Sequence, residues 1–228
     1  MSGVFSRILA ASVVSALCAC AATQSTRKLE PSGFLANYAQ LRPGRVDESL
    51  LVYIDRDADF SGYDSVLVEP VTIWHGGADA LADVPPQELE HLAQHLESAL
   101  RKQLGSDFEI VDKAGQGVLR VRAAITAAEG SKVALDIATT LLFPIDAVAM
   151  LATGSHAFVG RAAIEVEVLD GATNRRLAAA VDERAGRKSF DGSSSTWSDV
   201  EAAFDYWAER LSIRLATLRA LDQNLPSS

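Results

Sequence analysis

The chain has 228 residues and carries 21 basic against 30 acidic side chains, a formal net charge of −9 at pH 7. Binding to the phosphate backbone of nucleic acids depends on clustered Lys and Arg, and no basic cluster here exceeds pairs such as Arg27–Lys28 and Arg175–Arg176. The composition therefore excludes nucleic acid as a partner.

The first twenty residues are typical of a bacterial export signal. One basic residue, Arg7, precedes an aliphatic run from Ile8 to Leu17. A run of about ten residues is too short for a bilayer span, which needs roughly 20, but it has the length of a signal-peptide core. The run ends in LCAC, the pattern of a lipobox, with Leu at −3, a small residue at −1 and Cys at +1. We therefore predict that residues 1–19 are a lipoprotein signal peptide and that Cys20 is lipidated.

Lipidation of Cys20 predicts a stable membrane anchor. The thiol takes a diacylglycerol and the freed amine takes a third chain, and two or more acyl chains hold a protein firmly on a bilayer. Ala21, in place of Asp, follows the cysteine and predicts sorting to the outer membrane, with the protein on its periplasmic face. We expect residues 20–33 to be the lipidated Cys and its tether, and residues 34–228 to form a single periplasmic domain. Because Cys18 is removed with the signal peptide and Cys20 is taken up by the lipid, that domain needs a hydrophobic core and not disulfides for its stability.

Two segments have the periodicity of long amphipathic helices. Residues 85–104 carry leucines at helical spacing, with Asp83 as the N-cap, prolines in the first turn and Gly105 as the stop. Residues 198–221 begin with a capping box formed by Ser198 and Glu201 and continue with an apolar stripe.

Strands are predicted from alternation and β-branched content over residues 46–54, 65–74, 108–112, 118–126, 159–170 and 176–184. Pro70 makes the second of these an edge strand or a bulged one, and Asp170–Gly171 joins the last two as a hairpin. A short amphipathic segment over residues 34–42 precedes them all. We therefore expect an α+β domain of two layers, a mostly antiparallel sheet with the two long helices packed on one face.

Charged side chains on two of these strands point away from the predicted core. Arg120 and Arg122 alternate with apolar residues on one strand, and Glu165 and Glu167 do so on another. This pattern predicts cross-strand ion pairs on a solvated sheet face, each worth a fraction of a kcal/mol.

No motif predicts a metal, a cofactor or a catalytic group. The aspartates of residues 55–59 imitate a calcium loop, but Phe60 and Val66 stand where its Gly and Glu belong. His91 and His95 are four apart on the first helix, and they face away from its leucine stripe toward solvent. Neither the serines of GSSSTW nor Ser155 with His156 belong to a recognisable triad. We expect no cofactor and no enzymatic activity.

One apolar stretch, residues 133–152, separates two predicted strands. Asp136, Pro144 and Asp146 interrupt it, so it cannot span a bilayer as one helix. Apolar runs of this length are usually core, and a pair of short buried helices broken at Pro144 is one interpretation. The other is an exposed interaction segment, with the candidate residues Leu141, Leu142, Phe143, Ile145, Val148 and Leu151.

Several stretches resemble the lipoprotein family known as domain of unknown function 3313. They are SGFLANYAQLRPG, YDSVLVEPVTIW, GQGVLRVRAAIT, IEVEVLDGATNRRLAAAVDERAG and WSDVEAAFDYWAERL. The family's hairpin turn has Gly after the Thr, and here Asn174 stands in its place, a residue that also tolerates positive φ. The resemblance implies a lipid-anchored domain of this fold but no catalytic residues and no mechanism.

Two functions remain open at this level, and we expect the first of them. The first is a non-enzymatic envelope lipoprotein that contacts another envelope protein, in addition to the membrane that holds its lipid. The alternative is a module that binds a small molecule or a lipid. A pocket with apolar walls and a few polar groups would favour the alternative, and a flat exposed apolar patch would favour the first.

Overall fold

The computed structural model describes residues 31–76, 80–130, 161–185 and 197–224. They form one sheet and two helices, with elements β1 (Arg42–Pro43), β2 (Leu51–Ile54), β3 (Ser65–Val68), β4 (Thr72–Ile73), α1 (Pro86–Leu104), β5 (Glu109–Ile110), β6 (Val118–Glu129), β7 (Arg161–Asp170), β8 (Arg176–Ala185) and α4 (Ser198–Gln223). The strand order is β1-β2-β8-β7-β6-β3-β5, and β4 also pairs with β6.

The sheet is mixed, so the prediction of a mostly antiparallel sheet was wrong. The strands from β1 through β8 and β7 to β6 pair antiparallel, but β3 pairs parallel to both β5 and β6, and β4 pairs parallel to β6. The reason is the helix between them. A strand followed by a long helix and another strand makes a crossover connection, which brings the chain back to the same end of the sheet and produces parallel neighbours.

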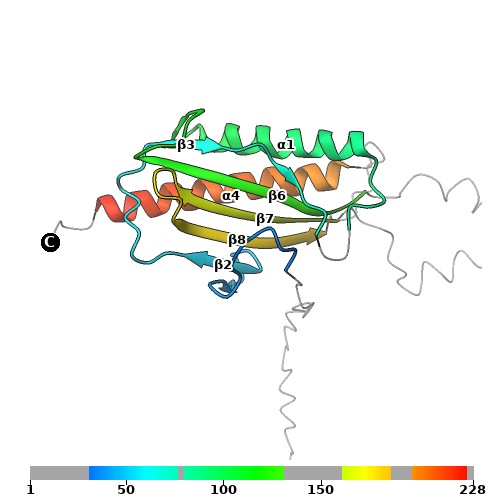
Figure 1. Ribbon diagram of the computed structural model, residues 1–228, viewed down its shortest axis with the longest axis horizontal. Helices are drawn as coiled ribbons and strands as arrows, with labels where there is room; N and C mark the ends of the chain where they lie inside the picture. The colour runs from blue at the N-terminus through cyan, green and yellow to red at the C-terminus, as the bar shows by residue number, and fades with distance from the viewer. Residues whose placement is uncertain (1–30, 77–79, 131–160, 186–196, 225–228) are drawn as a thin grey trace, which may run out of the picture.

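The two predicted helices are confirmed and lie side by side (Figure 1). Gly105 ends α1 as predicted, but the predicted N-caps are wrong. Pro85 is the N-cap of α1 and Trp197 that of α4, both without a side-chain cap hydrogen bond. Two prolines at the start of α1 remove two donors that a cap would otherwise satisfy. Ser198 is already the first helical residue of α4, so its position is one too late for a cap. In the described part of the chain, neither helix is both long and apolar enough to cross a bilayer.

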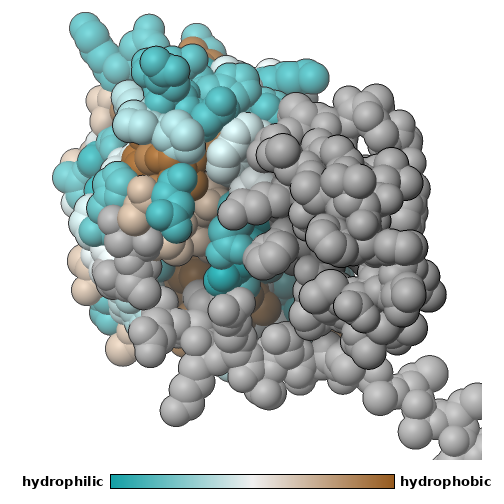
Figure 2. All heavy atoms as spheres, turned by 90° about the vertical axis from the view of Figure 1, so that its right-hand side faces the viewer, coloured by the Kyte–Doolittle hydropathy of each residue, from teal (hydrophilic) through white to brown (hydrophobic). Residues whose placement is uncertain are grey.

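Both helices cover the same face of the sheet, as expected. Their buried leucines and aromatic residues pack on the inward residues of the long strands, among them Leu119, Val121, Ile164 and Val168. In Figure 2, which shows the molecule from one end, the largest brown area of the described part lies in a recess between hydrophilic side chains. The larger cluster of buried hydrophobic residues joins the two helices to the sheet and is the main core.

The opposite face of the sheet is covered around Glu165 and Glu167, which corrects the prediction that it is solvated there. Residues 32–41, here called the N-terminal strap, lie across it and form a second, smaller core with Trp74, Ala124, Ala179 and Val181. Beneath the strap, Glu165 is 1% and Glu167 4% exposed. Alternation along a strand reports which residues share a face, but not what covers that face.

Pro70 interrupts the second predicted strand, where an edge strand or a bulge was expected. It lies between β3 and β4, and both segments run along β6. The hairpin between β7 and β8 is confirmed as well, and Asn174 in its turn has φ 61°.

Candidate functional site

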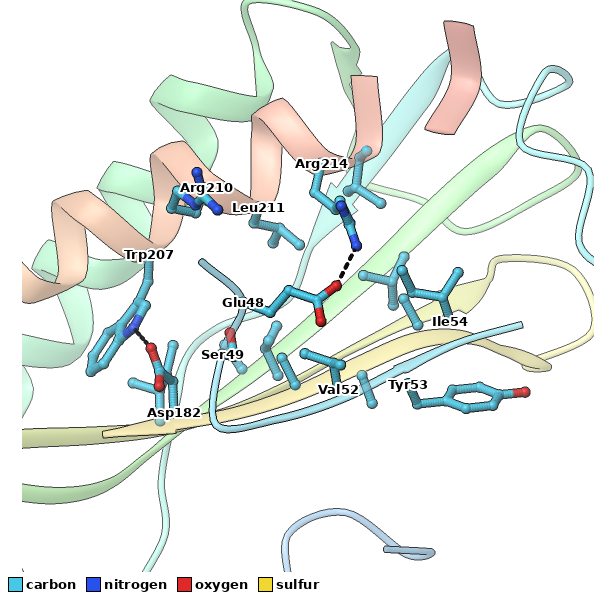
Figure 3. Close-up of a pocket in the computed structure, with 18 of the residues that line it drawn as sticks. Glu48, Ser49, Val52, Tyr53, Ile54, Asp182, Trp207, Arg210, Leu211 and Arg214 are labelled. Atoms are coloured by element: carbon cyan, nitrogen blue, oxygen red, sulfur yellow. Dashed lines mark hydrogen bonds and ion pairs between the residues drawn. The ribbon is translucent and has the colours of Figure 1, made fainter. Parts of the chain in front are cut away.

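A cavity of about 530 Å³ lies between the sheet and α4, beside β2 and β8 (Figure 3). Small-molecule sites typically have volumes of about 300–1,000 Å³. Protein interiors are otherwise close-packed, with few voids larger than a water molecule. A space of this size is therefore a departure from ordinary packing.

Small side chains on β8 create the cavity. Ala178 and Ala180 face α4 from the sheet, and both remain partly exposed although they lie between the two layers. From the other side, Leu211 and Leu218 of α4 also line the cavity and are only partly buried. Because α4 packs chiefly against α1, its edge next to β8 and β2 is left without large residues to contact.

The inner walls of the cavity are apolar. Aliphatic side chains from both helices and four strands line it, namely Val52, Ile54, Leu96, Leu100, Ala123, Ile164, Val166, Val168, Ala178, Ala180, Leu211, Leu215 and Leu218. A wall of this kind favours an apolar ligand group, because burial removes about 25 cal/mol per Å² of apolar surface from water.

The cavity opens beside residues 44–50, here called the mouth loop. The loop closes through a hydrogen bond from the amide of Gly44 to the carbonyl oxygen of Leu50, 2.9 Å. A Cβ on Gly44 would lie 1.8 Å from the carbonyl oxygen of Ser49, so the turn requires glycine. The amide of Leu50 donates to Asp182 on β8, 3.2 Å, and the loop is thereby held against the sheet.

Glu48 ties the mouth loop to α4. Its carboxylate accepts hydrogen bonds from Arg42 on the sheet side at 2.9 Å and from Arg214 on α4 at 2.8 Å. Figure 3 shows Glu48 pointing to Arg214 across the space between α4 and β2. The hydrogen bond from Arg42, followed by that from the backbone amide of Arg45, lowers the pKa of Glu48 to about 2. The carboxylate is thus ionised at the cavity mouth.

Asp182 and Trp207 form the second polar group of the cavity. The indole Nε1 donates to Asp182 over 2.6 Å, which fixes the ring against the cavity wall. Burial raises the pKa of Asp182, although the hydrogen bond from Trp207 acts in the opposite direction. The cavity therefore combines an apolar interior with a few anchored polar groups at its mouth.

A shallower hollow lies on the strap side of the sheet. Arg120, Arg122 and Arg176 line it, but each is paired to a carboxylate, of Glu69 or Glu167. Arg176 also donates to the strap, to the carbonyl oxygen of Asn37. Two carboxylates are shared among these three arginines, so each guanidinium has a partner, and we assign the cluster a structural role in fastening the strap.

The residues predicted for function fall outside the site. Cys20 and the candidate interaction segment, Leu141, Leu142, Phe143, Ile145, Val148 and Leu151, lie outside the described residues. His91 and His95 do not simply face water but pair with α4, through Glu201 at 2.9 Å and Asp205 at 3.1 Å. Across the described ranges, no three His, Cys, Asp or Glu side chains gather as a metal site requires.

The cavity residues were not predicted from the sequence. Glu48 lies in a segment predicted to be extended, and Arg214 is 166 positions further along the chain. The one sequence signal was the alanine run of β8, since three consecutive small residues in a buried strand cannot fill a layer. The apolar periodicity of α4 does not tell which strand the helix faces, so its position opposite β8 could not be predicted.

Comparison with known proteins agrees with the resemblance found in the sequence. The model of a family described as "Protein of unknown function (DUF3313)" matches residues 30–211, which confirms that resemblance. The chain is similar to the "Uncharacterized lipoprotein YdcL" of Escherichia coli K12 and of E. coli O157:H7, at 26% identity over 186 residues, 80% of this chain and 83% of each relative.

Solved structures match only weakly. A PelC dodecamer from Paraburkholderia phytofirmans aligns with 74% of this chain and 95% of its own, at 12% identity and a TM-score of 0.40. Protein XCC0632 from Xanthomonas campestris aligns with 71% of this chain and 88% of its own, at 9% identity and a TM-score of 0.43.

Proposed function

Since the chain belongs to the DUF3313 family, whose function is unknown, we propose that it is a non-enzymatic envelope lipoprotein that binds an amphipathic small molecule. The cavity between α4, β2 and β8 carries this proposal. It has apolar walls and a few anchored polar groups at its mouth, the combination that favours a ligand-binding module over a flat docking surface. The polar groups at the mouth are held in pairs, as suits recognition rather than chemistry.

The anchor is the second part of the proposal. A lipidated Cys20 would hold the domain on the periplasmic face of the outer membrane, and the named lipoprotein relatives support an anchor of this kind. Cys20→Ala removes the acyl acceptor and should release the protein from the membrane fraction, while Cys18→Ala should change nothing. A Cys20→Ala protein that is processed and still membrane-bound would contradict the lipobox assignment.

A partner protein is the third part, because a ligand carrier in the envelope needs a donor or an acceptor. The candidate interaction segment is the place to test it. Leu142→Lys and Val148→Lys should leave the protein folded but abolish its co-purification with an envelope protein after gentle detergent extraction. Unfolding of these variants would show instead that the segment belongs to the core.

The ligand-binding proposal is tested with a neutral photoactivatable lipid. We expect a hexadecanol derivative with a diazirine in its chain to label the full lipoprotein, held in phosphatidylcholine nanodiscs, on peptides of β8 and α4. Ala180→Phe fills the cavity and should reduce this labelling at least tenfold. Ala202→Phe places the same bulk on the exposed side of α4 and should leave it unchanged.

The labelled positions decide the result. Label spread evenly over the surface, or equal label in Ala180→Phe and wild type, would overturn the proposal. Circular dichroism of each variant establishes that it is folded before its labelling is compared.

A further inference from the structure

Arginines gather at the cavity mouth although the chain as a whole is acidic. Arg42 and Arg45 approach it from β1 and the mouth loop, and Arg210 and Arg214 from α4. The last two are four residues apart, so they lie on one face of the helix, a turn from each other. In Figure 3 both extend over the same side of the cavity, on either side of Leu211.

The two α4 arginines differ in what they bind. Arg214 pairs with the carboxylate of Glu48 at 2.8 Å. Arg210 donates only to a neutral group, the backbone carbonyl oxygen of Asp47, and among the described residues no carboxylate pairs with it. The mouth therefore has one guanidinium paired with an internal anion and, beside it, one that is bonded to a neutral carbonyl and pairs with no carboxylate of the described residues.

Three other carboxylates line the mouth. Asp182 accepts from Trp207 and from the amide of Leu50, Glu183 pairs with Arg161 at 2.8 Å, and Asp47 meets Arg210 through its backbone carbonyl. Glu48 is the carboxylate that pairs with arginines here, with Arg42 and Arg214. It lies on the mouth loop, outside the paired residues of β2, which begin at Leu51.

We propose that the cavity takes single-chain amphiphiles with an anionic head group, carboxylate or phosphate, which displaces Glu48 from Arg214 and pairs with Arg210. This inference rests on the proposed function, since the acyl chain would occupy the apolar cavity. The planar guanidinium fork binds either head group through two parallel hydrogen bonds. In the free protein the carboxylate of Glu48 imitates that head group.

The rim of the mouth suits the entry of an acyl chain. Val46, on the mouth loop, lines the cavity and is fully exposed. A tail that passes this side chain remains in contact with apolar surface while its head approaches the arginines.

Competition against the diazirine–hexadecanol label separates tail from head group. Hexadecanol, hexadecanoate and hexadecyl phosphate share one chain and differ only in the head, and the last two distinguish a carboxylate from a phosphate source. At pH 8 we expect both anions to compete at concentrations at least tenfold lower than hexadecanol. A hydrogen bond between charged groups contributes enough binding free energy to raise the affinity about tenfold or more.

Variants then locate the head-group site. The double variant Arg210→Gln with Arg214→Gln should remove most of the preference for the anionic competitors over hexadecanol. Lys102→Gln also replaces a positive charge by an amide, but at the exposed end of α1, and should retain that preference. Glu48→Gln should raise the preference several-fold, because the internal competitor has lost its charge.

The outcomes are distinguishable. If the diazirine probe labels no cavity peptide in the wild type, the proposed function itself fails. If the probe labels the cavity but the three competitors are equally effective, the head-group inference is wrong while the apolar site stands. The same holds if Glu48→Gln makes the two anions weaker competitors than they are in the wild type. A preference for one anion over the other identifies the source.

Discussion

The two faces of the sheet are built from the same strands by different rules. On β7, Ile164, Val166 and Val168 point toward the helices, and Glu165 and Glu167 point toward the N-terminal strap. The helix side is apolar yet leaves a cavity of about 530 Å³. The strap side is charged yet closed, because every buried carboxylate on it meets donors.

The strap side shows how a charged face can be buried. Glu165 accepts hydrogen bonds from the hydroxyl of Tyr38 at 2.5 Å and from the amides of Ser32 and Leu35. Glu167 pairs with Arg122 and Arg176, and Arg122 stacks on the ring of Phe34. Burial of a charge is tolerated when its hydrogen-bonding capacity is satisfied.

The helix side shows the converse. Its side chains are hydrophobic, so nothing there demands a specific partner, and α4 can sit against α1 without filling the space over β8. Apolar composition alone therefore does not indicate a well-packed layer. Specific hydrogen bonds and ion pairs hold the strap on its face of the sheet, whereas the helix face leaves a volume that a ligand could fill.

The largest expected effect concerns the packed half of the helix side. Phe204 of α4 is fully buried, and Phe204→Ala should lower the free energy of unfolding by about 3–5 kcal/mol. Ile213→Ala, on the exposed side of the same helix, should change it by less than about 0.5 kcal/mol. Urea unfolding measures both, and equal losses would show that α4 is only peripherally packed.

On the strap side, Glu165→Ala should cost about 1–3 kcal/mol, because the amides of Ser32 and Leu35 lose their acceptor. Hydrogen exchange should rise in residues 32–41 and remain unchanged in α1. Tyr38→Phe removes one hydrogen bond only and should cost about 1 kcal/mol. Protection of the strap that survives Glu165→Ala would mean that its apolar contacts hold it without the carboxylate.

Most of the regular structure could be predicted from local pattern. The leucine spacing of α1, the alternation of β6 and β7 and the tolerance of Asn174 for positive φ all depend on neighbours in the chain, and each was confirmed. The parallel pairing of β3 with β6 was missed because the strands were assigned one at a time, although the helix between them required a crossover.

The cavity and the strap could not be predicted, for a different reason. Each depends on contacts between segments more than 100 positions apart, such as Leu35 with Glu165 or Glu48 with Arg214. Glu165 has the same sequence environment whether a strap covers it or water does. The alanine run of β8 indicates a thin layer, but it does not tell whether a large side chain or an empty space lies opposite.

A pair of alanine substitutions measures the packing difference between the two faces directly. Ala124, under the strap, is fully buried, so Ala124→Phe should overpack it and cost about 1–3 kcal/mol or more. Ala180 faces the cavity, so Ala180→Phe should be nearly neutral in urea unfolding. If both variants lose stability equally, the space over β8 is not available to a side chain, and the contrast between the faces fails.

The smallest expected effect concerns pH and the mouth loop. The pKa of Glu48 is lowered from 4.5 to about 2, chiefly by Arg42, so the ionised carboxylate favours the folded state. That contribution is complete above about pH 4.5 and is lost as the pH falls toward 2. Glu48→Gln should therefore be less stable than wild type by under about 1 kcal/mol at neutral pH, as for other exposed ion pairs, and the difference should vanish between pH 4.5 and 2. Arg42→Gln removes the main partner of Glu48 and should reduce the same pH dependence. If the stability difference between Glu48→Gln and wild type persists unchanged at pH 2, Glu48 acts through its shape and not its charge.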